Sequence, residues 1–181
     1  VQYPARLAAG VASQRFTVLA GFTAACVYAV LLFGAVVRGS GAALVYPDWP
    51  LFGGQLVPTL SADPSVASLQ ALQFLHRLVA LVAGLILLAT AWVAWRRYRG
   101  RGWGPPEAQP TLLLLVGASA ALYIVQAVVG AAQIFTALAG WAEALHVALG
   151  AAIWALLVTA TVYAYCEARR PVCATVDGTP H

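Results

Sequence analysis

The sequence predicts an all-α membrane protein: a bundle of four transmembrane helices with the N and C termini in the cytoplasm. Of its 181 residues, 62% are hydrophobic and only 9% are charged, whereas charged residues make up about 25% of a typical soluble domain. The mean hydropathy is +0.83. Long apolar stretches alternate with segments rich in Arg, Gly or Pro. Lipid is therefore the expected solvent for most of the chain.

The first transmembrane helix is expected at residues 16–37, after a weakly basic leader. A run of about 22 residues crosses roughly 30 Å of hydrocarbon at about 1.5 Å per residue. The run is too long for the apolar core of a signal peptide, so the leader is not expected to be cleaved. Arg38 closes this helix at its outer end.

An ordered outer loop is expected between the first and second helices. Prolines and paired glycines in residues 45–58 exclude a continuous helix there. The same stretch contains aromatic residues, among them Trp49, which prefer the headgroup region of a bilayer. This pattern is typical of a flap that lies on the outer membrane surface.

Three further helices are expected at residues 66–95, 111–135 and 141–165. The basic run at residues 96–101 holds four arginines, and a short loop of this kind is placed in the cytoplasm by the positive-inside rule. Arg169 and Arg170 give the last helix the same orientation. Basic residues that flank apolar spans in this way give no indication of nucleic-acid binding.

Residues 1–170 are therefore expected to form one four-helix transmembrane domain in the plasma membrane. Residues 171–181 lack apolar content and are expected to be disordered. The cysteines at 26, 166 and 173 show neither metal-type spacing nor a haem-attachment signature. They are interpreted as packing residues or free thiols.

Two histidines within the expected spans are the candidate functional residues. His76 lies about ten residues into the second helix and His146 about five residues into the fourth, each counted from the outer end. Ionisable groups inside a membrane span indicate a functional site that faces the bundle interior. In a four-helix bundle with short connections the second and fourth helices lie diagonally across the core. An iron-bearing haem between them could take one imidazole on each face; the alternative is that each histidine bonds to a neighbouring carbonyl.

Several motifs resemble the haem A synthase family in order and spacing. They are Gly34-Ala35-Val36-Val37-Arg38-Gly39-Ser40-Gly41, Pro47-Asp48-Trp49-Pro50-Leu51, Gly54-Gln55-Leu56-Val57-Pro58, His76-Arg77, Gln126-Ala127-Val128-Val129-Gly130 and His146. Members of that family are usually eight-helix proteins made of two similar halves, and this chain resembles one half. The resemblance implies either a half-size member that self-associates or a derived relative.

The resemblance also implies roles for particular residues. His76 and His146 would be the axial ligands of one haem, and Arg77 and Arg38 would face its propionates, because guanidinium pairs well with carboxylate. Trp49 would cover the haem edge, and Gln126 would line the pocket. For Gln126 a hydrogen bond between helices is the competing interpretation. The family oxidises a methyl group of haem O to the formyl group of haem A, in the outer half of the membrane.

The chain departs from the family pattern in its carboxylates. The family usually has a glutamate three residues before the histidine of the second helix, where this chain has Gln73, which cannot accept or hold a proton in the same way. Glu143 precedes His146 by the same spacing and is expected on the same helix face. Glu143 is therefore either a relocated catalytic carboxylate or a group hydrated or paired with Arg38 or Arg77.

A second departure lies in the outer loop, where Tyr46 and Phe52 stand at positions that many members fill with cysteine. A thiol role in this loop is therefore excluded.

Two classes of function fit these observations. One is an oxidoreductase that converts haem O to haem A, with Glu143 and Gln73 as candidate catalytic residues. The other is a non-catalytic haem protein, carrying haem B or another haem as an electron carrier or haem chaperone beside a respiratory complex. Dense small residues favour close helix packing, or a homo-oligomer of a dimer or more.

Overall fold

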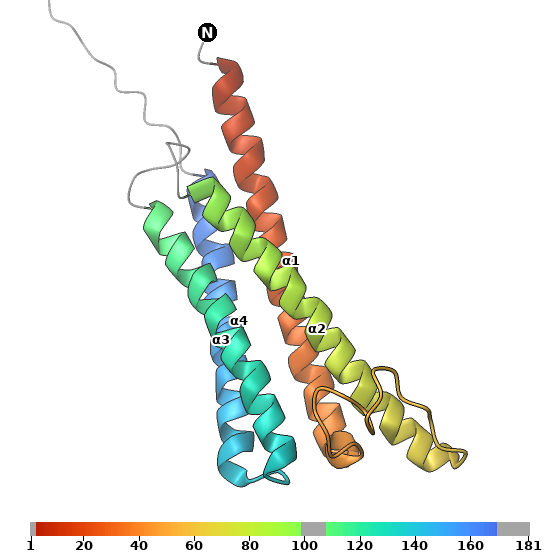
Figure 1. The fold of residues 1–181 in the computed structure, drawn as a ribbon. Helices are drawn as coiled ribbons and strands as arrows, with labels where there is room; N and C mark the ends of the chain where they lie inside the picture. Colours follow the sequence, from red (N-terminus) through yellow and green to blue (C-terminus); the bar gives the residue numbers. More distant parts are fainter. Residues whose placement is uncertain (1–2, 99–107, 170–181) are drawn as a thin grey trace, which may run out of the picture.

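The protein is a bundle of four long antiparallel helices with an ordered loop at one end (Figure 1). The computed structural model describes residues 3–98 and 108–169. The helices are α1 (Tyr3–Gly39), α2 (Pro64–Tyr98), α3 (Ala108–Phe135) and α4 (Gly140–Arg169), and a short 3₁₀ helix η1 (Ala42–Leu44) follows α1. All four long helices contain a segment long and apolar enough to cross a membrane. The predicted four-helix membrane bundle is confirmed, and the chain is an integral membrane protein.

The expected leader is not a separate segment. Helix α1 begins at Tyr3, so the residues before the first span continue its helix, and the apolar segment is Gln14–Gly39. The helix continues because no proline or glycine pair interrupts residues 5–33 strongly enough to end it. The basic run beyond Tyr98 and the expected disordered tail lie mostly outside the described residues.

The helices form a ring in which each packs against its two neighbours in sequence, and α1 closes the ring against α4. Helices α2 and α4 share no comparable packing, so they lie diagonally across the bundle as predicted. Figure 1 shows the α1/α2 pair diverging from the α3/α4 pair toward the end that carries the loop of residues 40–63. The two helix pairs are therefore farthest apart at that end.

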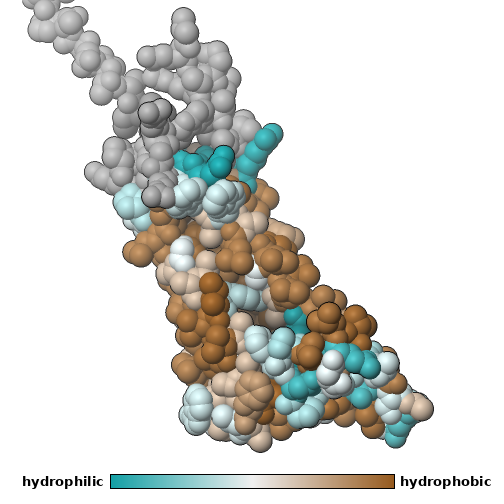
Figure 2. Space-filling view, in the orientation of Figure 1, coloured by the Kyte–Doolittle hydropathy of each residue, from teal (hydrophilic) through white to brown (hydrophobic). Residues whose placement is uncertain are grey.

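The tightly packed core lies in the middle and at the opposite end of the bundle. Thr23 of α1 and Thr90 of α2 share a buried hydrogen bond of 2.8 Å there, which joins two helices without exposing either hydroxyl to lipid. Large apolar side chains cover the outside of the bundle (Figure 2). The fully buried large apolar side chains of the core are Phe16, Leu87, Leu112, Val116, Ile153 and Leu157.

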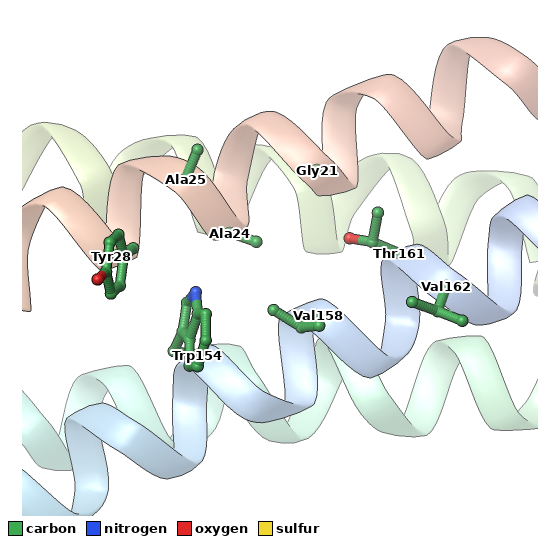
Figure 3. A pocket seen from close by; sticks show the side chains of 8 residues that line it. All are labelled: Gly21, Ala24, Ala25, Tyr28, Trp154, Val158, Thr161 and Val162. Atoms are coloured by element: carbon green, nitrogen blue, oxygen red, sulfur yellow. The ribbon is translucent and has the colours of Figure 1, made fainter.

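A groove between α1 and α4 runs along the apolar surface of the bundle (Figure 3). On the α1 side it is lined by small residues, Gly21, Ala24 and Ala25. Tyr28 and Trp154 close one end, with their ring centroids 5.3 Å apart. The lining is almost entirely apolar, as expected for a face in contact with lipid or with another helix.

Candidate functional site

Both histidines lie at the wider end of the bundle, one on each diagonal helix. His76 projects from α2 against α1, where a Cβ on Gly34 would lie 3.2 Å from its Cε1 atom. His146 projects from α4 against α3, where a Cβ on Gly130 would lie 3.1 Å from its Cε1 atom. Each imidazole is therefore seated on a glycine of the neighbouring helix. The same arrangement therefore occurs twice, once between α1 and α2 and once between α3 and α4.

Each imidazole has a buried polar atom that the protein leaves without a hydrogen-bond partner. Among the described residues, neither the Nδ1 atom of His76 nor that of His146 has a hydrogen-bond partner. A buried polar atom without a partner costs free energy, so it calls for an explanation such as a bound ligand. No carbonyl partner is found for His76 among the described residues, whereas the backbone of Gln126 on α3 acts on the imidazole of His146 without meeting hydrogen-bond geometry at Nδ1.

Gln73 anchors the outer loop to α2. Its side chain is buried; Oε1 accepts a hydrogen bond of 2.8 Å from the Tyr46 backbone N–H, and Nε2 donates one of 2.8 Å to the carbonyl of Ala43. Both ends of the amide are thus used by the backbone around η1. In this structure Gln73 holds the loop, and its side chain is already fully engaged.

Arg77 fastens the same loop farther along. Its Nη1 donates a hydrogen bond of 2.9 Å to the carbonyl of Leu51, and its guanidinium lies 4.6 Å from the ring centroid of Phe52. Its Nη2 is buried and has no partner among the described residues. The arginine is therefore held in place with one pair of N–H donors still available to an anion.

Arg38 and Glu143 pair with each other across the α1/α4 contact. The Nε atom of Arg38 lies 2.5 Å from Oε1 of Glu143. The arginine side chain is 58% exposed and that of the glutamate 27% exposed, so the pair sits at the rim of the bundle. Of the alternatives for Glu143, the structure shows the ion pair with Arg38.

The remaining predicted site residues, Gln126 and Trp49, take different positions. Gln126 lies on α3, where its Nε2 donates a hydrogen bond of 2.8 Å to the backbone carbonyl of His146. This hydrogen bond joins α3 to α4, as the competing interpretation of Gln126 expects. Trp49 is 43% exposed in the outer loop, at the same end of the bundle as the histidines.

One protein family matches most of the chain. The family described as cytochrome oxidase assembly protein (COX15-CtaA) matches residues 3–158. The chain belongs to this family. A Heme A synthase from Caulobacter sp. (strain K31) is 41% identical over 145 residues, covering 77% of this chain and 39% of that protein. A Heme A synthase from Ruegeria sp. (strain TM1040) is 31% identical over 141 residues, covering 72% of this chain and 33% of that protein.

The same stretch also resembles part of a second kind of protein. Protoheme IX farnesyltransferase 1 from Natronomonas pharaonis is 36% identical over 143 residues, covering 79% of this chain and 27% of that protein. The chain thus spans less than half the length of each of these relatives. No solved structure matches it.

The residues of this COX15-CtaA chain fit a haem as the group that the family name and the histidines imply. Two imidazoles come from diagonal helices, and an imidazole binds metal through either ring nitrogen. Arg77 adds a buried, unpaired Nη2 at the same end, and a guanidinium binds carboxylates such as propionates through paired N–H donors. Within the described residues, no group of three or more His, Cys, Asp and Glu could hold a metal ion.

Some residues that shape the site were missed by sequence reasoning. Phe52 is buried and its ring packs edge-on against Tyr46, 5.4 Å between centroids, and against Phe74 of α2, 5.2 Å. The apolar character of the loop was the available signal, but the partners depend on how the loop folds back. Tyr46 and Phe52 thus give the loop an aromatic contact at the positions that many members fill with cysteine.

Asp48 organises the tip of the loop. Its carboxylate accepts backbone hydrogen bonds from Gly54, 2.8 Å, and Gly53, 2.9 Å. These bonds lower the pKa of Asp48 below the ordinary value of 3.8, because they favour the ionised form. Both glycines have positive φ angles, 61° for Gly53 and 80° for Gly54, which this tight turn requires. The Gly-Gly pair in the sequence was the signal for this turn.

Proposed function

We propose that this chain is a haem-binding oxidoreductase of the haem A synthase type, which oxidises a methyl group of haem O to the formyl group of haem A. The observation that carries the proposal is the pair of glycine-seated histidines on diagonal helices, each with an unpartnered buried Nδ1. The relatives named Heme A synthase support the choice of reaction. The haem, when bound, supplies the redox chemistry.

The protein's own residues have separable tasks in this proposal. His76 and His146 hold the iron, and the unpaired Nη2 of Arg77 binds a propionate. Arg38 lies at the same rim and carries a second positive charge toward the propionates while paired with Glu143. Trp49 and the loop fastened by Gln73 cover the site and keep water from its edge.

Glu143 is the proposed carboxylate for the reaction. Conversion of a methyl group to an aldehyde removes four electrons and adds one oxygen atom, so the reaction also requires an electron acceptor and dioxygen or water as the oxygen source. A fixed carboxylate near the methyl group would accept protons released in this change. Its ion pair with Arg38 fixes it in one orientation at the rim. Gln73 contributes to the reaction indirectly, by holding the loop.

A second function, a non-catalytic haem carrier or chaperone, has a specific observation in its favour. Both groups that could stand for the family's carboxylate are engaged: Gln73 with the loop backbone and Glu143 with Arg38. In that case the haem would be haem B or another haem, beside a respiratory-chain partner. The site would need only the two histidines.

The proposed setting is the plasma membrane, with the haem in the outer half of the bilayer. The arginines at the end of α2, Arg96 and Arg97, support a cytoplasmic position for that end. The histidines then lie toward the opposite, outer surface.

Extraction of the pigment from the purified protein, followed by mass analysis, decides between the two functions. The synthase predicts haem O together with hydroxylated or formyl products. The carrier predicts a single unmodified haem, such as haem B. Protein purified without any haem, under conditions that load a control haem protein, would contradict both.

A further inference from the structure

Helix α3 contacts both diagonal helices through two polar side chains only three residues apart. Tyr123 donates a hydrogen bond of 2.6 Å from its hydroxyl to the backbone carbonyl of Ala80 on α2. Gln126 donates its 2.8 Å bond to the backbone carbonyl of His146 on α4. At about 100° per residue, positions three apart point about 60° from each other around a helix. One face of α3 can therefore reach both neighbours.

Each acceptor carbonyl belongs to a helical turn that ends in glycine. Gly84 follows Ala80 by four residues, and a Cβ on it would lie 2.8 Å from the Cε1 atom of Tyr123. Gly150 follows His146 by four residues, and a Cβ on it would lie 3.2 Å from the Nε2 atom of Gln126. Because the two glycines have no side chain, the polar groups of Tyr123 and Gln126 can approach these carbonyls. Each carbonyl already accepts a hydrogen bond within its own helix, but it has two lone pairs and can accept a second.

Both contacts lie on the turns that carry the histidines. Ala80 is one turn beyond His76 on α2, and the second acceptor is the carbonyl of His146 itself. Because α2 and α4 do not pack closely on each other, their relative position depends on the helices between them. The two bonds from α3 fix how far each histidine-bearing turn is rotated and shifted.

We propose that Tyr123 and Gln126 are positioning residues that set the spacing and register of α2 and α4, and through them the distance between His76 and His146. The part of this inference that concerns haem rests on the proposed function. The part that concerns helix spacing does not, because both bonds are made by the protein alone. The tyrosine and the glutamine act through the backbones they bind, with no contact to the iron.

The spacing is measured first in haem-free protein, by electron paramagnetic distance measurement between spin labels at exposed positions 81 on α2 and 147 on α4, in a background without the native cysteines. Tyr123→Phe and Gln126→Leu each remove one bond and are expected to shift or widen the distance distribution. The control, Tyr28→Phe, removes a hydroxyl from a ring that packs on Trp154 and should leave the distribution unchanged. Unchanged distributions in both test variants would overturn the inference, even if the variants melt at lower temperature.

Haem titration of the same variants then separates this inference from the proposed function. Loss of a group that orients a metal-ligating histidine typically weakens metal binding about 10- to 100-fold, and a loss of this order is expected for Gln126→Leu. A shifted distance in a protein that binds no haem would contradict the proposed function and leave the spacing role intact. Normal haem binding with unchanged distances would contradict the spacing role and leave the proposed function intact.

Discussion

At the scale of single residues, the site is defined by which polar groups the protein leaves unpaired. The Nδ1 atoms of His76 and His146 and the Nη2 atom of Arg77 are buried without partners among the described residues. Gln73 and Glu143, by contrast, are engaged in specific contacts. The hydroxyl of Tyr46 and the Oε1 atom of Gln126 are also buried without partners among the described residues. The imidazoles and the guanidinium are the groups in this set that suit an iron with carboxylate-bearing side arms.

The role of Glu143 is tested by Glu143→Gln, which is expected to abolish haem A formation while haem stays bound. Stability should change by no more than about 1 kcal/mol, since exposed ion pairs contribute little. Product is measured by mass analysis of extracted haem. Arg38→Gln breaks the same ion pair but keeps the carboxylate, so its loss of product should be smaller. Glu167→Gln, at the far end of α4, is the control; normal product from Glu143→Gln would refute the catalytic role.

At the scale of elements, the loop of residues 40–63 is bound to α2 at several points along its length. Gln73 holds its beginning, Arg77 holds its middle, and Oε1 of Gln70 accepts a hydrogen bond of 2.7 Å from the N–H of Ser61 near its end. The Phe52 ring packs between Tyr46 and Phe74. The loop is thus held to α2 by separate contacts, each of which can be removed on its own.

Gln73→Leu is expected to open the first part of the loop, because it leaves the Tyr46 N–H and the Ala43 carbonyl unsatisfied, at about 1–3 kcal/mol for each buried group. Hydrogen exchange at the Tyr46 amide measures the opening. Gln70→Leu is the matched control and should expose only the stretch around Ser61. Equal protection of Tyr46 in wild type and Gln73→Leu would contradict the anchoring role.

Gln73→Glu is expected to loosen the loop when the new carboxyl group is ionised. An ionised carboxylate cannot donate to the Ala43 carbonyl, whereas a protonated one can replace both bonds of the amide. The Gln73→Glu protein should therefore hold its loop at low pH and release it as the carboxyl group ionises. Loop protection that does not vary with pH in this variant would show that the amide donor is dispensable.

The loop tip is expected to be sensitive to acid through Asp48. Its pKa is lowered by the Gly54 and Gly53 N–H groups, so the stabilisation is complete above the ordinary value of 3.8 and is lost as the pH falls below it. Hydrogen exchange at the two glycine amides, followed from about pH 6 to about pH 3, should show protection lost only at the acid end. Asp48→Asn should weaken the protection of both glycine amides at every pH and remove this pH dependence. An acid transition that persists in Asp48→Asn would show that another group causes it.

At the scale of the whole molecule, the bundle is tightly packed at one end and holds its histidines at the other. The sequence predicted the four spans, the diagonal placement of α2 and α4 and an ordered loop between α1 and α2, because apolar length and breaker residues determine these features. It did not predict the tasks of Gln73, Tyr123, Gly84 and Gly150. Those depend on contacts between residues far apart in the chain, which periodicity within one helix does not encode.

Self-association is the prediction that belongs to this scale. The small residues of the α1/α4 groove allow close approach of another helix, so the protein is expected to be a dimer or larger in mild detergent. Gly21→Leu would fill this groove and should shift native mass toward monomer. Gly117→Leu fills the groove between α2 and α3 and is the control. A monomeric wild-type protein that retains haem and activity would contradict self-association.

The central claim is that His76 and His146 bind one haem iron between α2 and α4, and the absorption and paramagnetic resonance spectra of the purified protein test it most directly. The wild-type protein should show a six-coordinate low-spin haem. His76→Ala and His146→Ala should each lose that signal or convert it to high spin, and His→Met at either position should shift it. A low-spin spectrum that is unchanged in both single alanine variants would contradict the account.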